Sequence, residues 1–101
     1  DGKFEEALVE LHKAKLLAEL HGLNTTYHYA DVLYHVCGCS RLTGRLDEAR
    51  KALELSFPIR NRLSGPKSLY VANLFFELGM VEMKSNAPDK AERAFQRSLQ
   101  I

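Results

Sequence analysis

Long apolar segments are missing from the sequence, whose longest uninterrupted apolar run covers only a few residues. A helix that crosses a bilayer needs about 20 apolar residues, so the sequence predicts no membrane span. An excess of charge is missing as well, because 14 basic residues face 13 acidic ones and the net charge is +1. This balance gives no reason to expect nucleic acid or an anionic membrane as the main partner.

Cysteine is scarce and is confined to Cys37 and Cys39. Two residues apart on one helix, they point to different sides and cannot form an intramolecular disulfide. A reducing, cytoplasmic setting is the simpler interpretation. His35 precedes them, but His-x-Cys-x-Cys is not the spacing of a closed zinc site. We therefore expect both cysteines to be packed rather than to bind a metal.

Motifs for catalysis and cofactor binding are also missing. The six glycines are spread over the chain and form no phosphate-binding loop. No Gly-x-Ser-x-Gly motif occurs, and no histidine has a nucleophile placed beside it by a known local motif. The sequence therefore predicts a protein that is not an enzyme and that uses no metal, nucleotide or other cofactor.

An internal repeat is what the sequence does contain. Ala7, Ala49 and Ala91 are separated by 42 residues each time. A large apolar residue follows each alanine after four positions, and a small residue follows after seven. These residues are Leu11, Leu53 and Phe95, and then Ala14, Ser56 and Ser98. Offsets of four and seven residues lie on one face of a helix.

A second stripe precedes Ala49 and Ala91 at matching offsets. It consists of Leu33, Val36 and Cys37 in one copy and of Phe75, Leu78 and Gly79 in the next. Each unit is therefore a helix, a short turn and a second helix. We expect helices over roughly 3–21, 25–43, 46–62, 67–85 and 88–101, and no strand. Asn24 or Thr25 is expected to cap the second helix, and Asp1-Gly2-Lys3 to form a turn.

This pattern resembles the tetratricopeptide repeat family, and its period resembles the longer variant found in kinesin light chains. Segments such as Lys51-Ala52-Leu53-Glu54-Leu55 and Ala94-Phe95-Gln96-Arg97-Ser98 carry the resemblance. It implies an all-α, right-handed solenoid of stacked antiparallel helix pairs. Residues 1–101 would form one domain, with a half repeat over 1–23, a repeat over 24–65 and another over 66–101. It also implies that the first helix of each repeat lines a concave face.

The function predicted from these features is a scaffold that binds a peptide or helix of another protein on that face. The candidate binding residues lie outside the repeat's core stripe, at three- and four-residue spacing on the two first helices. They are Asp31, Tyr34, His35, Arg41, Asn73, Phe76, Glu77, Met80, Met83 and Lys84. We expect Tyr34 to lie beside Phe76 and Arg41 near Met83. The other interpretation of Phe76 and Met80 is that helices of the same chain cover them.

Two further functions remain open. The repeats could serve self-assembly, with the groove filled by the same chain or by a second copy that stacks end to end, or they could regulate an enzyme elsewhere in a longer chain. The chain does not begin with Met, so we expect a segment that further repeats flank. The basic residues Arg60, Arg62 and Lys67 around the connector are expected to form a solvated face.

Overall fold

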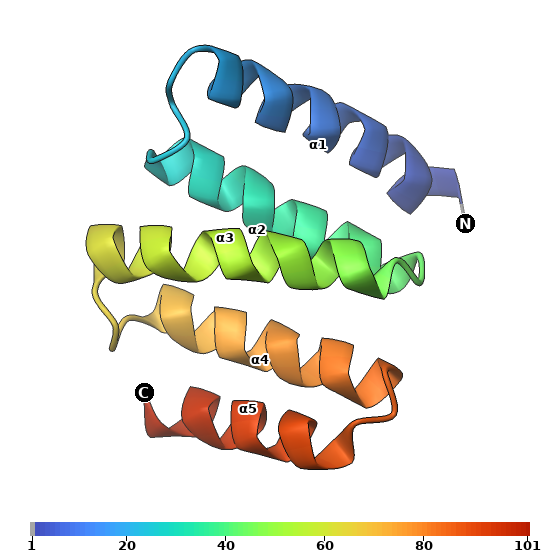
Figure 1. The fold of residues 1–101 in the computed structure, drawn as a ribbon, viewed down its shortest axis with the longest axis vertical. Helices are drawn as coiled ribbons and strands as arrows, with labels where there is room; N and C mark the ends of the chain where they lie inside the picture. Colours follow the sequence, from blue (N-terminus) through green and yellow to red (C-terminus); the bar gives the residue numbers. More distant parts are fainter. Residues whose placement is uncertain (1) are drawn as a thin grey trace.

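Five α-helices make up the computed structural model, which describes residues 2–101 (Figure 1). They are α1 (Gly2–Leu20), α2 (Tyr27–Leu42), α3 (Leu46–Ser64), α4 (Leu69–Lys84) and α5 (Pro88–Gln100). None of these residues forms a strand. The predicted all-α fold is confirmed, and every helix boundary falls within two residues of its expected place. Gly2 and Lys3 are helical, so the predicted turn is wrong there, and Asp1 lies outside the described residues.

The caps of the helices follow the repeat. Thr26, rather than Asn24 or Thr25, is the N-cap of α2, because its hydroxyl accepts a hydrogen bond from the Tyr29 backbone N–H at 3.2 Å. Ser68, 42 residues later, caps α4 by the same bond to the Val71 backbone N–H. Such a cap stabilises a helix by about 1 kcal/mol. The 42-residue period therefore extends to the start of each first helix.

The turns between paired helices also repeat in their backbone conformation. Gly44 follows α2 with φ at +81°, and Asn86 follows α4 with φ at +58°. Glycine and asparagine are the residues that enter this left-handed region at the lowest cost. Each turn lets the chain reverse at once, so that α3 returns along α2 and α5 returns along α4.

The helices stack in chain order, from α1 at one end of the long axis to α5 at the other (Figure 1). Each helix packs on the next, and α2 also touches α4. Within residues 2–101, no such backbone contact joins α3 to α1 or to α5. The side formed by α2 and α4 is therefore more tightly packed than the side formed by α1, α3 and α5, and we call it the inner side of the slab. The molecule measures 37 × 33 × 17 Å, and its smallest dimension fits two layers of helices.

The predicted stripes form the core. Leu33 and Cys37 of α2 and Ala49 of α3 are fully buried, and Leu53 is 1% exposed. Cys39 is half-buried. Because both thiols are at least partly covered by neighbouring side chains, the expected packing of the two cysteines is confirmed.

The helix pairs α2–α3 and α4–α5 fill the same core position with different shapes. Leu53 of α3 packs in the cluster that holds Cys37 of α2. At the matching positions, the ring of Phe95 lies directly over Gly79, so close that a Cβ on Gly79 would stand 2.4 Å from its Cε1 atom. A larger residue on one helix is thus matched by a smaller one on its neighbour, which keeps the total volume similar.

Buried charges join neighbouring helices in pairs. Arg60 is 5% exposed, Glu82 is 5% exposed and Glu77 is 8% exposed. Their partners are Asp31 for Arg60, Arg50 for Glu82 and Arg41 for Glu77. The prediction that Arg60 belongs to a solvated face is therefore wrong. Arg60 is buried because it lies seven residues after Leu53, on the inward side of α3.

None of the described helices combines the length and the apolar character needed to cross a bilayer.

Candidate functional site

A cavity of about 200 Å³ opens between α2 and α4. Asp31, Tyr34 and His35 line it from α2, and Asn73 lines it from α4. Ala30 and Leu74 supply an apolar base, since Ala30 is 1% and Leu74 is 2% exposed. The structure therefore brings four of the ten candidate binding residues together around one hollow, which lies on the inner side of the slab.

Tyr34, which lines this cavity, has a phenol that stays protonated at neutral pH. Burial, and after it the nearby Glu77 carboxylate, raises the pKa of Tyr34. The tyrosine ring meets the His35 ring edge to face, with 5.8 Å between the centroids. Because the hydroxyl keeps its proton at neutral pH, it can donate as well as accept a hydrogen bond.

Arg60 and Tyr70 also line the cavity, although neither was among the candidates predicted from the sequence. Arg60 Nη2 donates to Asp31 Oδ1 at 2.5 Å, and its Cζ atom lies 4.0 Å from the centre of the Tyr70 ring. One signal could have indicated that Arg60 is buried. It stands 42 residues after Ala18, which is a buried position of α1. No pattern in the sequence marked Tyr70.

Arg41 and Glu77 lie on the facing sides of α2 and α4 and bind each other. Arg41 Nε donates to Glu77 Oε2 at 2.8 Å, and each side chain is only 11% exposed. Their charges are therefore committed to holding the two helices together. A partner would meet a neutral pair here, not a free cation and a free anion.

The remaining candidates, Phe76, Met80, Met83 and Lys84, are not brought to the cavity. Phe76 is 50% exposed, and its ring lies 5.5 Å from that of Phe95 on α5. Phe76 and Met83 match Tyr34 and Arg41 in the repeat, and those residues turn toward α4. By the same geometry, Phe76 and Met83 turn to the side of α4 that faces away from α2.

The expected neighbours of Tyr34 and Arg41 were therefore wrong. Tyr34 shares the cavity with Asn73 in place of Phe76, and Arg41 meets Glu77 in place of Met83. Glu77 comes six residues before Met83, which is about one and two-thirds helical turns. The repeat period gives equivalent positions, but it does not give the sliding offset between two stacked helices.

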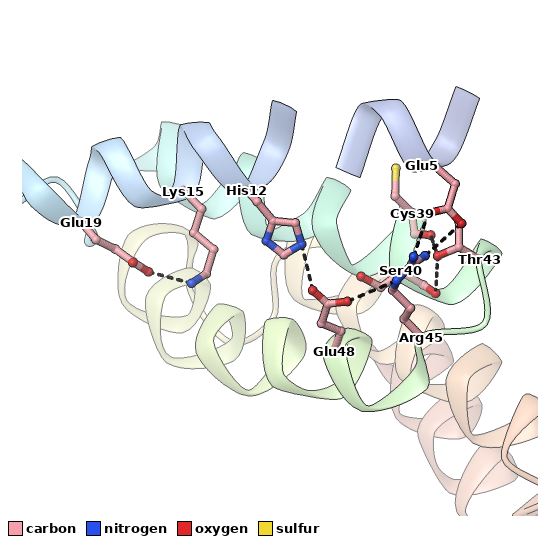
Figure 2. Close-up of polar contacts among 9 residues, drawn as sticks. All are labelled: Glu5, His12, Lys15, Glu19, Cys39, Ser40, Thr43, Arg45 and Glu48. Carbon is pink, nitrogen blue, oxygen red and sulfur yellow. Dashed lines mark hydrogen bonds and ion pairs between the residues drawn. The ribbon is translucent and has the colours of Figure 1, made fainter. Parts of the chain in front are cut away.

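The opposite side of the slab carries exposed ion pairs between second helices. Figure 2 shows His12 of α1 reaching across to Glu48 of α3, and Glu5 of α1 reaching across to Arg45, the residue just before α3. His12 Nε2 lies 2.8 Å from Glu48 Oε1, and Arg45 Nη2 lies 2.7 Å from Glu5 Oε2. All four side chains are more than a third exposed, so each pair contributes little to stability.

The cavity is lined by groups that can form hydrogen bonds and aromatic contacts. Its walls offer an amide, a phenol, an imidazole and two aromatic faces, with one carboxylate that already accepts from arginine. Among residues 2–101, no three histidine, cysteine or acidic side chains gather closely enough to hold a metal ion. Cys37 is buried, and burial raises the pKa of its thiol to about 12, which removes the thiolate that a nucleophile needs.

Comparison with known protein families gives a match over most of the sequence. A family model described as tetratricopeptide repeat matches residues 28–101, about three quarters of the chain. No curated protein and no solved structure matches the chain.

Proposed function

Because the chain belongs to the tetratricopeptide repeat family, whose repeats generally mediate protein–protein interaction, we propose that the cavity between α2 and α4 holds a peptide segment of a partner protein. The single observation that supports this is the gathering of Asp31, Tyr34, His35 and Asn73 around a hollow of about 200 Å³. In this family the first helices line the concave face, and α2 and α4 are the first helices here.

The groups at the cavity suit an extended peptide. The Asn73 amide can donate to one peptide carbonyl and accept from one peptide N–H. Tyr34 and Tyr70 provide flat, rigid surfaces for an apolar side chain of the partner. Their area is available with little loss of side-chain entropy, because each tyrosine has two rotatable bonds. Asn73 thus sets the register and the aromatic rings contribute the contact area.

The test is a selection of peptides followed by measurement on variants. Random phage-displayed peptides are selected on the wild-type chain, and the affinity of the best ones is measured for Asn73→Ala and for Tyr34→Ala. We expect each variant to weaken binding by about tenfold, the effect of one lost hydrogen bond or ring contact. Asn61→Ala on the exposed side of α3 is the matched control and should leave the affinity unchanged.

Two results would contradict the proposal. Selected peptides could bind the folded double variant Tyr34→Ala/Asn73→Ala as tightly as they bind wild type. Alternatively, Asn61→Ala could weaken them as much as Asn73→Ala does. Either result would move the binding site away from the cavity.

Self-assembly is the second candidate function, and a different observation favours it. On α1, Leu17 is 57% exposed, whereas its equivalent Ile59 on α3 is 9% exposed because α2 covers it. Leu16 and Leu20 are also exposed. We propose that a further helix, from a second copy or from flanking sequence, covers this face. Light scattering over a concentration series tests the second copy: Leu17→Gln should abolish any dimer, and a wild-type monomer at high concentration would refute it.

On this proposal the domain is not itself an enzyme. A role as the regulatory domain of a larger enzyme stays a prediction that sequence beyond residues 1–101 would test. The two free thiols, Cys37 and Cys39, are compatible with a reducing, cytoplasmic setting.

A further inference from the structure

A second groove lies between α3 and α5, on a different face of α4 from the cavity. Its volume is about 430 Å³. Phe75 and Leu78 of α4 and Ala94 of α5 form an apolar floor. We call it the α3–α5 groove. It does not depend on the proposed function of the cavity.

Three cations stand along the α5 wall of the α3–α5 groove. Lys90, Arg93 and Arg97 line it and are exposed. Their spacing of three and four residues places them on one helix face. Within residues 2–101, none of them forms an ion pair, and Arg97 only lies over the Phe75 ring, with Cζ 5.3 Å from the centroid. The α5 wall therefore carries three positive charges, none of which lies within ion-pair distance of a carboxylate of the described residues.

The fourth cation that lines the groove, Arg50, is paired with the one carboxylate that lines it, Glu82. Arg50 of α3 donates from Nε to Glu82 at 2.9 Å and from Nη2 to Ser85 at 2.5 Å. Glu54, also on α3, stands at the position equivalent to His12 and is exposed, but it forms no ion pair with Lys90, its counterpart. The excess along the α5 wall thus remains.

The preceding groove, between α1 and α3, is different. There the matching positions are occupied by Glu48 and Lys51, with Leu55 in place of Arg97. Glu48 is bridged to His12, and a second bridge joins Glu5 to Arg45 (Figure 2). In the α1–α3 groove, Glu48 thus contacts His12, and Lys15 is paired with Glu19. Within residues 2–101 the three cations on the α5 wall have no such ion-pair partner, and they stand above an apolar floor.

The same comparison indicates that the α3–α5 groove stays open if the stack continues. The α1–α3 groove is lined only by α1, α2 and α3, although α4 and α5 follow them. A repeat added after α5 would occupy the place that α4 and α5 hold relative to the α1–α3 groove. It would therefore leave the α3–α5 groove uncovered.

We propose that the α3–α5 groove binds an acidic peptide segment of another protein, with an apolar side chain placed on Phe75 and Leu78. The charge complementarity decides the sign of the ligand, and the apolar floor favours a peptide over nucleic acid, whose backbone offers no apolar anchor. From Lys90 to Arg97 the helix rises about 10 Å, a distance that about three residues of extended peptide span. A segment with two or three carboxylates flanking a leucine or phenylalanine meets these requirements.

The probe is a fluorescein-labelled peptide of about ten residues, rich in glutamate and containing two leucines, measured by fluorescence anisotropy at low salt. The groove variant is Lys90→Gln/Arg93→Gln/Arg97→Gln. The control variant removes as much charge elsewhere and is Lys13→Gln/Arg62→Gln/Lys67→Gln. We expect the groove variant to bind about tenfold more weakly, the combined effect of three exposed charge pairs, and the control variant to bind within about twofold of wild type. Circular dichroism establishes that both variants are folded.

Three outcomes would overturn the proposal. The wild-type chain could fail to bind the peptide, or the control variant could lose as much affinity as the groove variant. A single-stranded oligonucleotide could bind wild type more tightly than the peptide and lose that affinity in the groove variant, which would assign the groove to nucleic acid. Replacing both leucines of the peptide with glutamine should also lower its affinity for the groove, because no apolar side chain then contacts the apolar floor. If the groove variant binds the acidic peptide more weakly but still binds the cavity-selected peptides as tightly as wild type does, the groove and the cavity are separate sites.

Discussion

The contact between Gly79 and Phe95 makes Gly79→Ala a sharp test of the core. The added Cβ would stand 2.4 Å from Cε1, 2.6 Å from Cδ1 and 2.8 Å from Cζ of the phenylalanine ring. Carbon atoms that are not bonded rest about 3.5–4.0 Å apart. The whole Phe95 ring must therefore move by about 1 Å. The Phe76 ring, whose centroid lies 5.5 Å from that of Phe95, is on the same face of α4 as Gly79.

Two effects oppose each other in this substitution. Alanine is favoured over glycine inside a helix by about 1 kcal/mol. Overpacking of a filled core costs about 1–3 kcal/mol. We expect Gly79→Ala to lower the free energy of unfolding by up to about 2 kcal/mol, or to leave it unchanged where the half-buried ring finds room to move.

Making the same substitution in a Phe95→Leu variant separates the two effects. Leu53 and Cys37 occupy the matching positions one repeat earlier and are almost fully buried, so this architecture accommodates leucine opposite a residue with a Cβ. In Phe95→Leu, the clash is absent, and Gly79→Ala should raise the free energy of unfolding by about 1 kcal/mol. The double-mutant cycle should then give a coupling energy of about 1–3 kcal/mol between Gly79 and Phe95.

Urea unfolding followed by far-UV circular dichroism supplies these free energies. Gly38→Ala on α2 is the matched control, because a Cβ added there would meet no packed neighbour within 4 Å, and it should stabilise the chain in either background. If Gly79→Ala stabilises the wild-type chain as much as it stabilises Phe95→Leu, the ring does not occupy the space over Gly79. The account of compensating shapes would then be wrong.

Arg41→Met should lower the free energy of unfolding by about 3–5 kcal/mol, because it strands the Glu77 carboxylate, whose side chain is 11% exposed. Adding Glu77→Leu should restore most of the loss in thermal unfolding, and no recovery would refute the pairing. Burial, and then the bond to Glu19, raises the pKa of Tyr29 to about 12 from 10.0. The stabilisation that protonated Tyr29 contributes is therefore present below about pH 10 and is lost as pH rises toward 12. Tyr29→Phe should make the free energy of unfolding depend less on pH in this range. An ultraviolet titration in which no tyrosine ionises near pH 12 would contradict the raised pKa. Cys37 should resist iodoacetamide in the folded chain and react after unfolding, because its buried thiol has a pKa of about 12; rapid labelling of the folded chain would contradict its burial.

The helices and their inward stripes were predictable because the information is local and recurs three times. Ala49, Leu53 and Ser56 lie within eight residues of one another, and the same spacing returns at Ala91. Helical periodicity then fixes which side faces inward. The all-α fold, the approximate helix boundaries and the burial of Cys37 follow from this pattern.

The contacts of the candidate site were predictable only in part. Asp31, Tyr34 and Asn73 do meet at one cavity, because each lies on the side of a first helix that faces the other first helix. The pairing of Arg41 with Glu77 spans 36 residues and depends on how far α4 slides along α2. That offset is set by packing of side chains from several helices, which a single sequence does not state.

The buried ionic links also bear on how freely the units could be rearranged. Arg50 of one repeat is joined to Glu82 of the next, and Arg41 to Glu77 across the same boundary. At the positions of Glu77 and Glu82 the preceding unit carries His35 and Ser40. A tandem duplication of residues 24–65 would leave Arg41 facing His35 and Arg50 facing Ser40, each without its carboxylate. Neighbours in this chain are consequently matched to each other, and their order along the polypeptide is not interchangeable.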